Sequence, residues 1–279
     1  MPLLPTTNAD GQEVIPMTEA QKYLFDLKGF IALPGLLAEE ELQEIRAHQM
    51  KFLYERESLP ADERDNHGGP SQILLDHPAV VGVLNEILSY QALATEQCYG
   101  FRYDHTYTSH RESGHDNFSP HGGGGYFNFR GNSHIYQMQS GKIHSGLTRV
   151  VWELNEVAEG DGGTLFLPGS HKAAFPRPQE WSERDSPLWE SYACPAGSAV
   201  IFTEALCHSG TRWNNEQRDR LCLFTCYDTV NSKWGKGCPT PEVIASFPEK
   251  RRTLFRGVWH GMSEVPGINQ YYEESNKAV

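Results

Sequence analysis

The chain has 279 residues and a formal net charge of −12, with 38% hydrophobic, 11% aromatic and 22% charged residues. This composition is that of an ordinary globular protein and excludes wholesale disorder. The negative charge argues against nucleic acid or a membrane surface as a partner, because both need basic patches. No apolar run approaches the roughly 18 residues that cross a bilayer, and the N-terminus does not resemble a secretory signal. We therefore expect a cytoplasmic protein.

Helices are predicted in the first third of the chain. Thr18 and Gln21 form a capping-box pair, and the helix that they begin is expected to end at Gly29. The other predicted elements are a loose arm over residues 1–16, a strand over 30–33, and helices over about 38–55 and 77–88. We expect these helices to brace a sheet rather than to carry chemistry.

Apolar runs typical of β-strands dominate the second half of the chain, and glycine and proline turns separate them. They lie in residues 147–154, 161–172, 197–208 and 220–224. Alternation from Leu93 onward predicts one earlier strand, with Phe101 and Tyr103 on the same side. These patterns predict a mainly β protein with flanking helices.

The connection between His105 and Gly146 has no clear periodicity, and it carries further histidines at positions 110, 115, 121, 134 and 144. Long connections of this kind are either disordered or form a functional lid. The histidine and aromatic content of this one favours a lid. No repeat or low-complexity linker is present, so we predict one domain. Its expected parts are a helical segment at about 17–90, a core at about 93–230 and a C-terminal cover at 231–279.

His208 and Arg220 have the order and spacing of an oxygenase site. A non-haem Fe(II) centre commonly uses two histidines and one carboxylate on one face of the metal, which leaves the other positions open. The second histidine lies on a late strand, and an arginine on the next strand can hold a dicarboxylate through paired, charge-assisted hydrogen bonds. His208 ends the third apolar run and Arg220 begins the fourth.

Several segments carry motifs that point to a known family. They are residues 30–37, residues 161–172 with Pro-Gly-Ser-His-Lys after a Gly-Gly turn, residues 197–202, and His208 with Arg220. In these motifs the chain resembles the phytanoyl-CoA dioxygenase-like (PhyH) family of Fe(II)/2-oxoglutarate oxygenases, over about residues 18–230. The resemblance implies a double-stranded β-helix, that is, a cupin-like jelly roll, with Fe(II) as the metal and 2-oxoglutarate as the co-substrate.

The resemblance also implies roles for single residues. His208 matches the distal iron ligand, and Arg220 matches the residue that pairs with the far carboxylate of 2-oxoglutarate. Arg218 is the alternative to Arg220, because alternation places it on the same face. Trp152 matches a position that lines the co-substrate pocket, although it could equally be an ordinary core residue.

The chain departs from the family at the proximal ligand, because it contains no His-x-Asp motif. We place the proximal site at His121-Gly122-Gly123, with Gly123 where the carboxylate is expected, and His134 is the competing histidine. Three readings follow. Glu204, four residues before His208 on the same expected strand face, supplies the carboxylate; or the open position binds halide, as in related halogenases; or the site has lost its metal.

The resulting prediction is an Fe(II)- and 2-oxoglutarate-dependent dioxygenase that uses O2 and hydroxylates a small organic molecule. The predicted metal ligands are His121, His208 and Glu204. Two alternatives remain, a halogenase that uses the open position at Gly123 and a non-catalytic small-molecule-binding barrel. No nucleic acid or membrane partner is expected. The sequence does not determine the oligomeric state.

Overall fold

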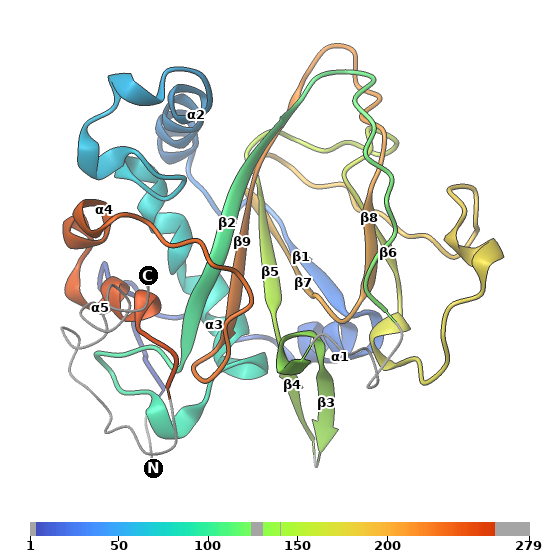
Figure 1. Ribbon diagram of the computed structural model, residues 1–279, viewed down its shortest axis with the longest axis horizontal. Coiled ribbons are helices and arrows are strands. Elements are labelled where there is room, and N and C mark those ends of the chain that lie inside the picture. Colours follow the sequence, from blue (N-terminus) through green and yellow to red (C-terminus); the bar gives the residue numbers. More distant parts are fainter. Residues whose placement is uncertain (1–3, 124–130, 140, 260–279) are drawn as a thin grey trace. The chain divides into compact units, whose positions relative to one another are not determined.

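The structure is a computed structural model that describes residues 4–123, 131–139 and 141–259 (Figure 1). Its contacts group the chain into two compact units. The sheet unit comprises Thr18–Leu42 and Thr108–Phe224, and the helical unit comprises Met1–Met17, Gln43–Tyr107 and Thr225–Val279. The single domain that we predict from the sequence stays a prediction.

One layer of the sheet unit belongs to a five-stranded sheet with the order β1-β7-β5-β9-β2. The strands are β1 (Phe30–Leu33), β2 (Phe101–Arg111), β5 (Thr148–Glu153), β7 (Ser198–Thr203) and β9 (Arg220–Thr229). Strand β7 pairs antiparallel with both β1 and β5. All six β7 residues are buried, as expected of a central strand covered on both faces.

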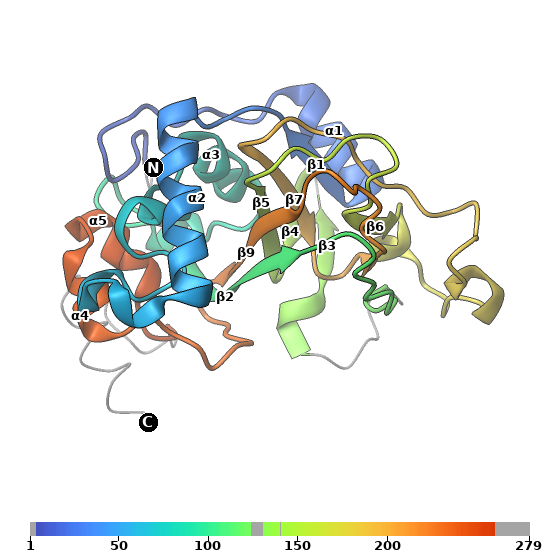
Figure 2. The same ribbon diagram turned by 90° about the horizontal axis from the view of Figure 1, so that it is seen from above.

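A second layer is formed by the antiparallel pair β6 (Thr164–Leu167) and β8 (Cys207–Gly210). The two layers are separate ribbons in Figures 1 and 2. Phe166 of β6 packs against the five-stranded sheet, with its ring centroid 4.3 Å from that of Phe30 and 5.0 Å from that of Phe202. Val151 and Phe224 belong to the same buried cluster. The apolar core of this unit therefore lies between its two layers, as in a jelly roll.

The predicted fold class, mainly β with flanking helices in a cupin-like jelly roll, is confirmed. Two local predictions are wrong. The run 197–208 is not one strand, because β7 ends at Thr203 and β8 begins only at Cys207. The connection after His105 is also not irregular throughout, since β2 continues to Arg111 and a hairpin follows with β3 (Tyr136–Gln139) and β4 (Lys142–Ser145). Residues 124–130 and 140 lie outside the described residues.

The first helix, α1 (Glu19–Lys28), begins as predicted. Thr18 and Gln21 form both hydrogen bonds of a capping box. Gly29 ends the helix with φ 82°, and a Cβ there would lie 2.7 Å from His171 Nδ1, so that glycine is required. The apolar residues that suggested the helix are nevertheless largely exposed, and Phe25 is the helix residue that is fully buried.

The other described helices are α2 (Glu39–Tyr54), α3 (Pro78–Ile87), α4 (Pro241–Ser246) and α5 (Glu249–Arg252). Short 3-10 helices cover Arg56–Ser58, Ala61–Glu63, Gly69–Leu75, Gln91–Leu93, Gly131–His134, Ser170–Lys172, Gln179–Ser182 and Thr253–Phe255. The predicted apolar stripe of α3 is buried. Within the described residues, no helix combines the length and the apolar character that a membrane span requires.

The prediction of a loose N-terminal arm is wrong for its described part. Glu96 accepts hydrogen bonds from the backbone N–H groups of Thr6 and Thr7, at 2.9 and 3.2 Å, and also from their hydroxyls. Lys250 donates to the Thr7 carbonyl at 2.7 Å and pairs with Glu96 at 3.2 Å. The arm is held by partners about 90 and 243 residues away in sequence, which no local pattern reveals.

Candidate metal centre and co-substrate site

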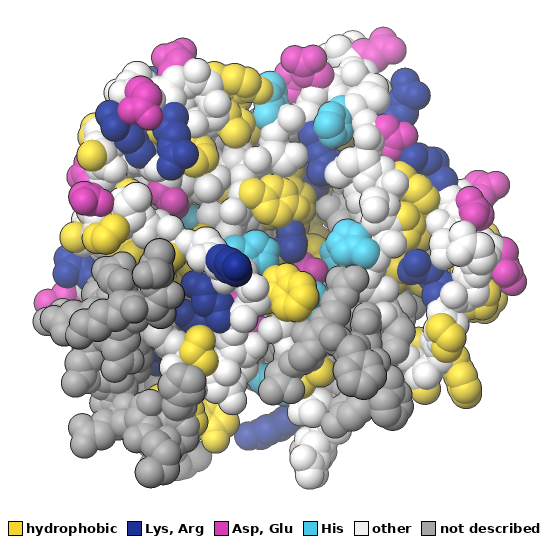
Figure 3. Space-filling view, in the orientation of Figure 1, with side chains coloured by type: hydrophobic (Ala, Val, Ile, Leu, Met, Phe, Trp, Pro, Cys, Tyr) yellow, Lys and Arg dark blue, Asp and Glu magenta, His cyan; other side chains and the backbone are white. Residues whose placement is uncertain are grey.

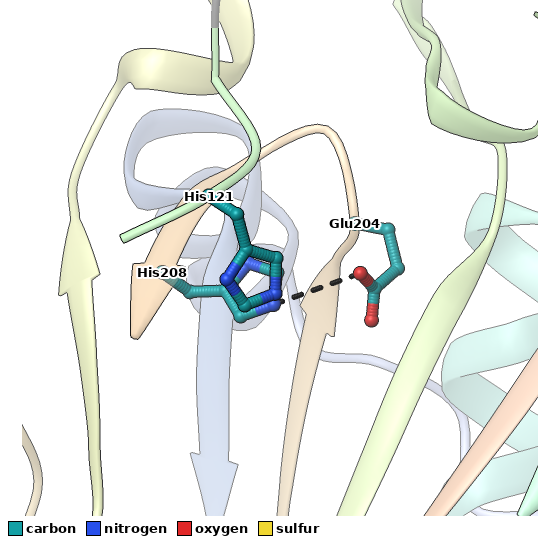
Figure 4. A group of neighbouring side chains, drawn as sticks. All are labelled: His121, Glu204 and His208. Atoms are coloured by element: carbon teal, nitrogen blue, oxygen red, sulfur yellow. Dashed lines mark ion pairs between the residues drawn. The ribbon is translucent and has the colours of Figure 1, made fainter. Parts of the chain in front are cut away.

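Three side chains from separate parts of the sheet unit converge at one end of the β6–β8 layer. His121, Glu204 and His208 each offer a ligand atom, and these atoms all lie within 4.8 Å of one another. Figure 4 shows the two imidazoles against each other, with Glu204 reaching toward them from the turn after β7. The three residues that we predict as ligands from the sequence are therefore neighbours in space.

Backbone pairing places the two histidines side by side. The N–H of His121 donates to the His208 carbonyl at 3.0 Å, and the N–H of His208 donates to the His121 carbonyl at 2.9 Å. The ring centroids are 4.2 Å apart. Gly122 follows with φ 73°, and a Cβ there would lie 2.4 Å from the Leu206 carbonyl oxygen. A glycine is therefore needed for the His121 segment to approach β8 this closely.

Both imidazoles are oriented by backbone carbonyls. His121 Nδ1 lies 2.7 Å from the Ser119 oxygen, and His208 Nδ1 lies 2.8 Å from the Leu206 oxygen. Since a carbonyl only accepts, each Nδ1 carries the proton and each Nε2 keeps its lone pair for a metal. Burial lowers the pKa of His208 to about 4, although Glu204 opposes this effect, so the ring is neutral at physiological pH. This donor chemistry fits a divalent transition metal.

Glu204 is close to His208, but not for the reason that the sequence suggested. It lies in the turn between β7 and β8 rather than on one strand face, and its N–H donates to the Leu147 carbonyl at 2.8 Å. One carboxylate oxygen forms an ion pair with Arg149 Nε, and the other lies 3.6 Å from His208 Nε2. Burial alone would raise the pKa of Glu204, but Arg149 and His208 lower it to about 2. The carboxylate is therefore ionised.

A side chain at position 123 would not point into the space between these ligands. It has φ 70°, and a Cβ there would lie 2.9 Å from Cys207 Cβ. Successive side chains of β8 alternate between its two faces. His208, opposite Phe166 in the strand register, belongs to the core face, so Cys207 belongs to the outer face. A carboxylate side chain at position 123 would start toward Cys207, whereas Glu204 already reaches the histidines.

Two other histidines take different positions. His134 is buried, and it is close enough to Glu204 to lower the pKa of that carboxyl, but it is outside the group of converging ligand atoms. His171 has its Nε2 3.1 Å from the Asp26 carbonyl oxygen, and its ring lies against Tyr136. Figure 3 shows several histidine side chains exposed on the face in view.

Arg220 lies at the start of β9 and is 1% exposed. Its Nε and Nη2 donate to the two oxygens of Glu153, at 3.1 and 2.5 Å. Nη2 also lies 3.0 Å from the Tyr192 hydroxyl and 3.4 Å from Thr164 Oγ1. Nη1 is buried and has no hydrogen-bond partner among the described residues. A buried guanidinium edge without an acceptor fits the carboxylate of a small dicarboxylic acid.

The alternatives to Arg220 lie elsewhere. Arg218 precedes β9, and its half-exposed side chain pairs with Glu156 at 3.1 Å and Asp161 at 3.3 Å. Trp152 is fully buried, but the alternation of β5 places it on the face opposite to Val151, which belongs to the core cluster between the layers. Its role in lining the co-substrate pocket stays a prediction, on a face that differs from that of Arg220.

Sequence reasoning missed Glu153 as the partner of Arg220 and Tyr192 as the neighbour of both. The signal was present in β5, where Arg149 and Glu153 interrupt an otherwise apolar strand at positions that share the face of Val151. A charged residue in a buried strand requires a partner. The pattern does not say which partner that is, because β9 follows only some 70 residues later.

A jelly roll that brings together two histidines, a buried carboxylate and a buried arginine defines the class, which is that of the Fe/2-oxoglutarate-dependent enzymes. The chain belongs to the phytanoyl-CoA dioxygenase (PhyH) family, whose sequence profile matches residues 25–222. Fe(II) and 2-oxoglutarate are the cofactors of this family, so the predicted family and cofactors are confirmed. No curated protein sequence matches the chain.

Solved structures share the fold. The chain is similar to HygX from Streptomyces hygroscopicus with nickel and 2-oxoglutarate bound, at 22% identity and a TM-score of 0.60 over 76% of this chain and 87% of HygX. It is also similar to SnoK, a non-haem α-ketoglutarate-dependent carbocyclase from nogalamycin biosynthesis, at 16% identity and a TM-score of 0.54 over 88% and 94% of the two chains. The epimerase SnoN from the same biosynthesis gives 16% identity and a TM-score of 0.51 over 76% and 83%. SnoK and SnoN are named for different reactions, so the fold alone does not determine the reaction.

Proposed function

We propose that this chain is an Fe(II)- and 2-oxoglutarate-dependent oxygenase that hydroxylates a small organic molecule. The observation that carries the proposal is the convergence of His121, Glu204 and His208, whose ligand atoms lie within 4.8 Å of one another. Two imidazoles and one carboxylate are the set that non-haem Fe(II) oxygenases use on one face of the metal. The other positions are then free for co-substrate and O2.

Each surrounding residue has a distinct task in this proposal. The carbonyls of Ser119 and Leu206 fix the two rings so that their Nε2 atoms face the metal. Arg149 holds Glu204 through an ion pair on the oxygen that does not face His208. Iron, together with 2-oxoglutarate and O2, supplies the oxidation of a substrate C–H bond, coupled to decarboxylation of 2-oxoglutarate.

Arg220 holds the far carboxylate of 2-oxoglutarate in this proposal. Its Nη1 is the buried donor without an acceptor, and a carboxylate there would form a charge-assisted hydrogen bond. Phe224 links the two ends of the site, because the guanidinium carbons of Arg149 and Arg220 lie 5.7 and 5.6 Å from the centre of its ring.

Two features support hydroxylation over the predicted alternatives. Halogenation requires an open metal position where the carboxylate is missing, but Glu204 is close to both imidazoles and Gly123 is directed toward Cys207. A binding barrel without metal has no need of three converging ligand atoms, nor of rings whose Nδ1 atoms are already satisfied by carbonyls.

The test is an anaerobic titration with Fe(II) followed by 2-oxoglutarate, monitored by visible absorption. We expect a metal-to-ligand charge-transfer band and, once O2 is admitted, succinate formed from 2-oxoglutarate. The matched control is Arg218→Ala, which removes an arginine outside the site and should leave both signals unchanged. A protein that shows neither the band nor succinate is not an oxygenase of this kind.

A further inference from the structure

Glu153 and Arg220 form an ion pair that is almost completely buried. The carboxylate is 0% exposed and the guanidinium 1% exposed. Two parallel hydrogen bonds, of 3.1 and 2.5 Å, join them. This is the bidentate arrangement that a free carboxylic acid forms with arginine, but here the carboxylate belongs to the chain.

Neighbouring hydroxyls complete the pair. Tyr192 donates its O–H to Glu153 Oε1 at 2.5 Å and accepts from Arg220 Nη2 at 3.0 Å. Burial and the Glu153 charge raise the pKa of Tyr192 well above its usual value, so the phenol remains a neutral donor. Thr164 Oγ1 lies 3.4 Å from the same Nη2. Arg220 Nε and Nη2 are thus occupied, and Nη1 is the donor left over.

The charge of this cluster is already balanced. Among the described residues, Arg220 is the cation that forms an ion pair with Glu153. Arg149, whose guanidinium lies over the same Phe224 ring, is paired with Glu204. A second carboxylate that approaches Arg220 Nη1 therefore brings an unbalanced negative charge into a buried place, at a few ångströms from Glu153.

We propose that Glu153 competes with the far carboxylate of 2-oxoglutarate for Arg220 and is the residue that sets co-substrate affinity and selectivity. This inference rests on the proposed function. The chain then binds 2-oxoglutarate more weakly than Arg220 alone would allow. It also discriminates weakly against 2-oxo acids of the same length that lack the second carboxylate.

Removing the charge at position 153 should raise the affinity for 2-oxoglutarate through its effects on both the complex and the free protein. In the complex it removes the repulsion between two carboxylates. In the free protein it leaves Arg220 buried without a counter-ion, and the incoming carboxylate then supplies one. Glu153→Gln keeps the size of the side chain and an oxygen that can accept from Arg220, so it isolates the charge.

The experiment measures binding rather than turnover. Wild type and Glu153→Gln, loaded with Ni(II), are titrated calorimetrically with 2-oxoglutarate and with 2-oxopentanoate, which has a methyl group in place of the far carboxylate. We expect Glu153→Gln to bind 2-oxoglutarate at least ~10-fold more tightly than wild type does, given the size of buried charge interactions. The dissociation constant for 2-oxopentanoate should change by less than about twofold, since that ligand does not contact Arg220 through a charge.

The outcomes separate the inference from the proposed function. If Glu153→Gln binds 2-oxoglutarate equally well or more weakly, Glu153 merely orients Arg220; the inference is overturned and the proposed function stands. If neither protein binds 2-oxoglutarate, both are overturned.

Wild type alone provides a second test, which holds if the variant does not fold. A buried arginine without a competing carboxylate should favour the dicarboxylate by more than about 100-fold. Competition by Glu153 predicts a wild-type preference for 2-oxoglutarate over 2-oxopentanoate below about 100-fold, and a larger preference contradicts it.

Discussion

Two Arg–Glu pairs face the core of the sheet unit, one at each end of strand β5. Arg149 of β5 pairs with Glu204, and Glu153 of β5 pairs with Arg220. Both guanidiniums lie over the ring of Phe224. The chemistry of the pairs is the same, but their proposed roles are reversed: Glu204 works as a ligand and its arginine supports it, whereas Arg220 works as a receptor and its glutamate restrains it.

The two pairs differ in which partner has an atom left to bind a further ligand. In the first pair, a carboxylate oxygen of Glu204 points to His208 Nε2 at 3.6 Å. In the second pair, the guanidinium keeps a buried nitrogen without an acceptor. A buried ion pair adds little net stability over an apolar pair of the same volume. We therefore expect each pair to be retained for the ligand that its remaining atom binds, and not for stability.

The largest effect should follow from breaking the Arg220 pair. Arg220→Met leaves Glu153 buried and unpaired, and we expect a loss of roughly 3–5 kcal/mol in the free energy of unfolding, measured by urea denaturation of the metal-free protein. The double variant Glu153→Leu/Arg220→Met should recover most of that stability, but should not recover 2-oxoglutarate binding. If the double variant binds 2-oxoglutarate as wild type does, Arg220 is not its receptor.

Breaking the Arg149 pair should act on the metal instead. Arg149→Met removes the partner that holds Glu204, and losing such an outer partner typically lowers metal affinity by about 10- to 100-fold. Anaerobic calorimetry with Fe(II) measures this, and Arg149→Lys, which keeps the charge, is the matched control. Unchanged Fe(II) affinity in Arg149→Met would show that Glu204 needs no support or is not a ligand.

Trp152 should matter for packing only. Trp152→Phe leaves a cavity in a fully buried place, and we expect a cost of about 1–3 kcal/mol in unfolding free energy. The dissociation constant of 2-oxoglutarate should stay within about twofold, because the face of β5 that carries Trp152 is not the face of Glu153. A larger weakening of 2-oxoglutarate binding would restore Trp152 to the co-substrate pocket.

The smallest effect is expected at Arg218. Its ion pairs with Glu156 and Asp161 are partly exposed, and pairs of this kind contribute about 0–1 kcal/mol. Arg218→Ala should therefore leave stability nearly unchanged and the binding of metal and 2-oxoglutarate intact. A loss of 2-oxoglutarate binding in Arg218→Ala, with Arg220 in place, would reverse the choice between the two arginines.

Local patterns in the sequence were sufficient for the parts of the fold that local chemistry determines. The Thr18–Gln21 capping box and the strand that begins at Arg220 were predictable from a few neighbouring residues. Glu204 was chosen on an expected strand face that does not exist, because β7 ends one residue before it. A tight turn brings it close to His208 all the same.

Contacts across long sequence separations could not be predicted. Glu153 is 67 residues from Arg220, and Tyr192 is 39 residues from Glu153. Their meeting depends on the order of β5 and β9 in the sheet and on the loop that carries Tyr192. A single sequence shows that β5 contains charged residues, but the partner of each charge is decided by packing.

Fe(II) binding to Glu204→Gln shows whether Glu204 is the third metal ligand. The substitution keeps the size of the side chain and an oxygen that can accept from Arg149, and it removes the charge that a metal ligand needs. With Glu204 as the third ligand, anaerobic calorimetry should show Fe(II) affinity reduced by more than about 100-fold, beyond the usual effect of an outer partner. Fe(II) affinity equal to that of wild type would contradict the account, because the metal would then be held without Glu204.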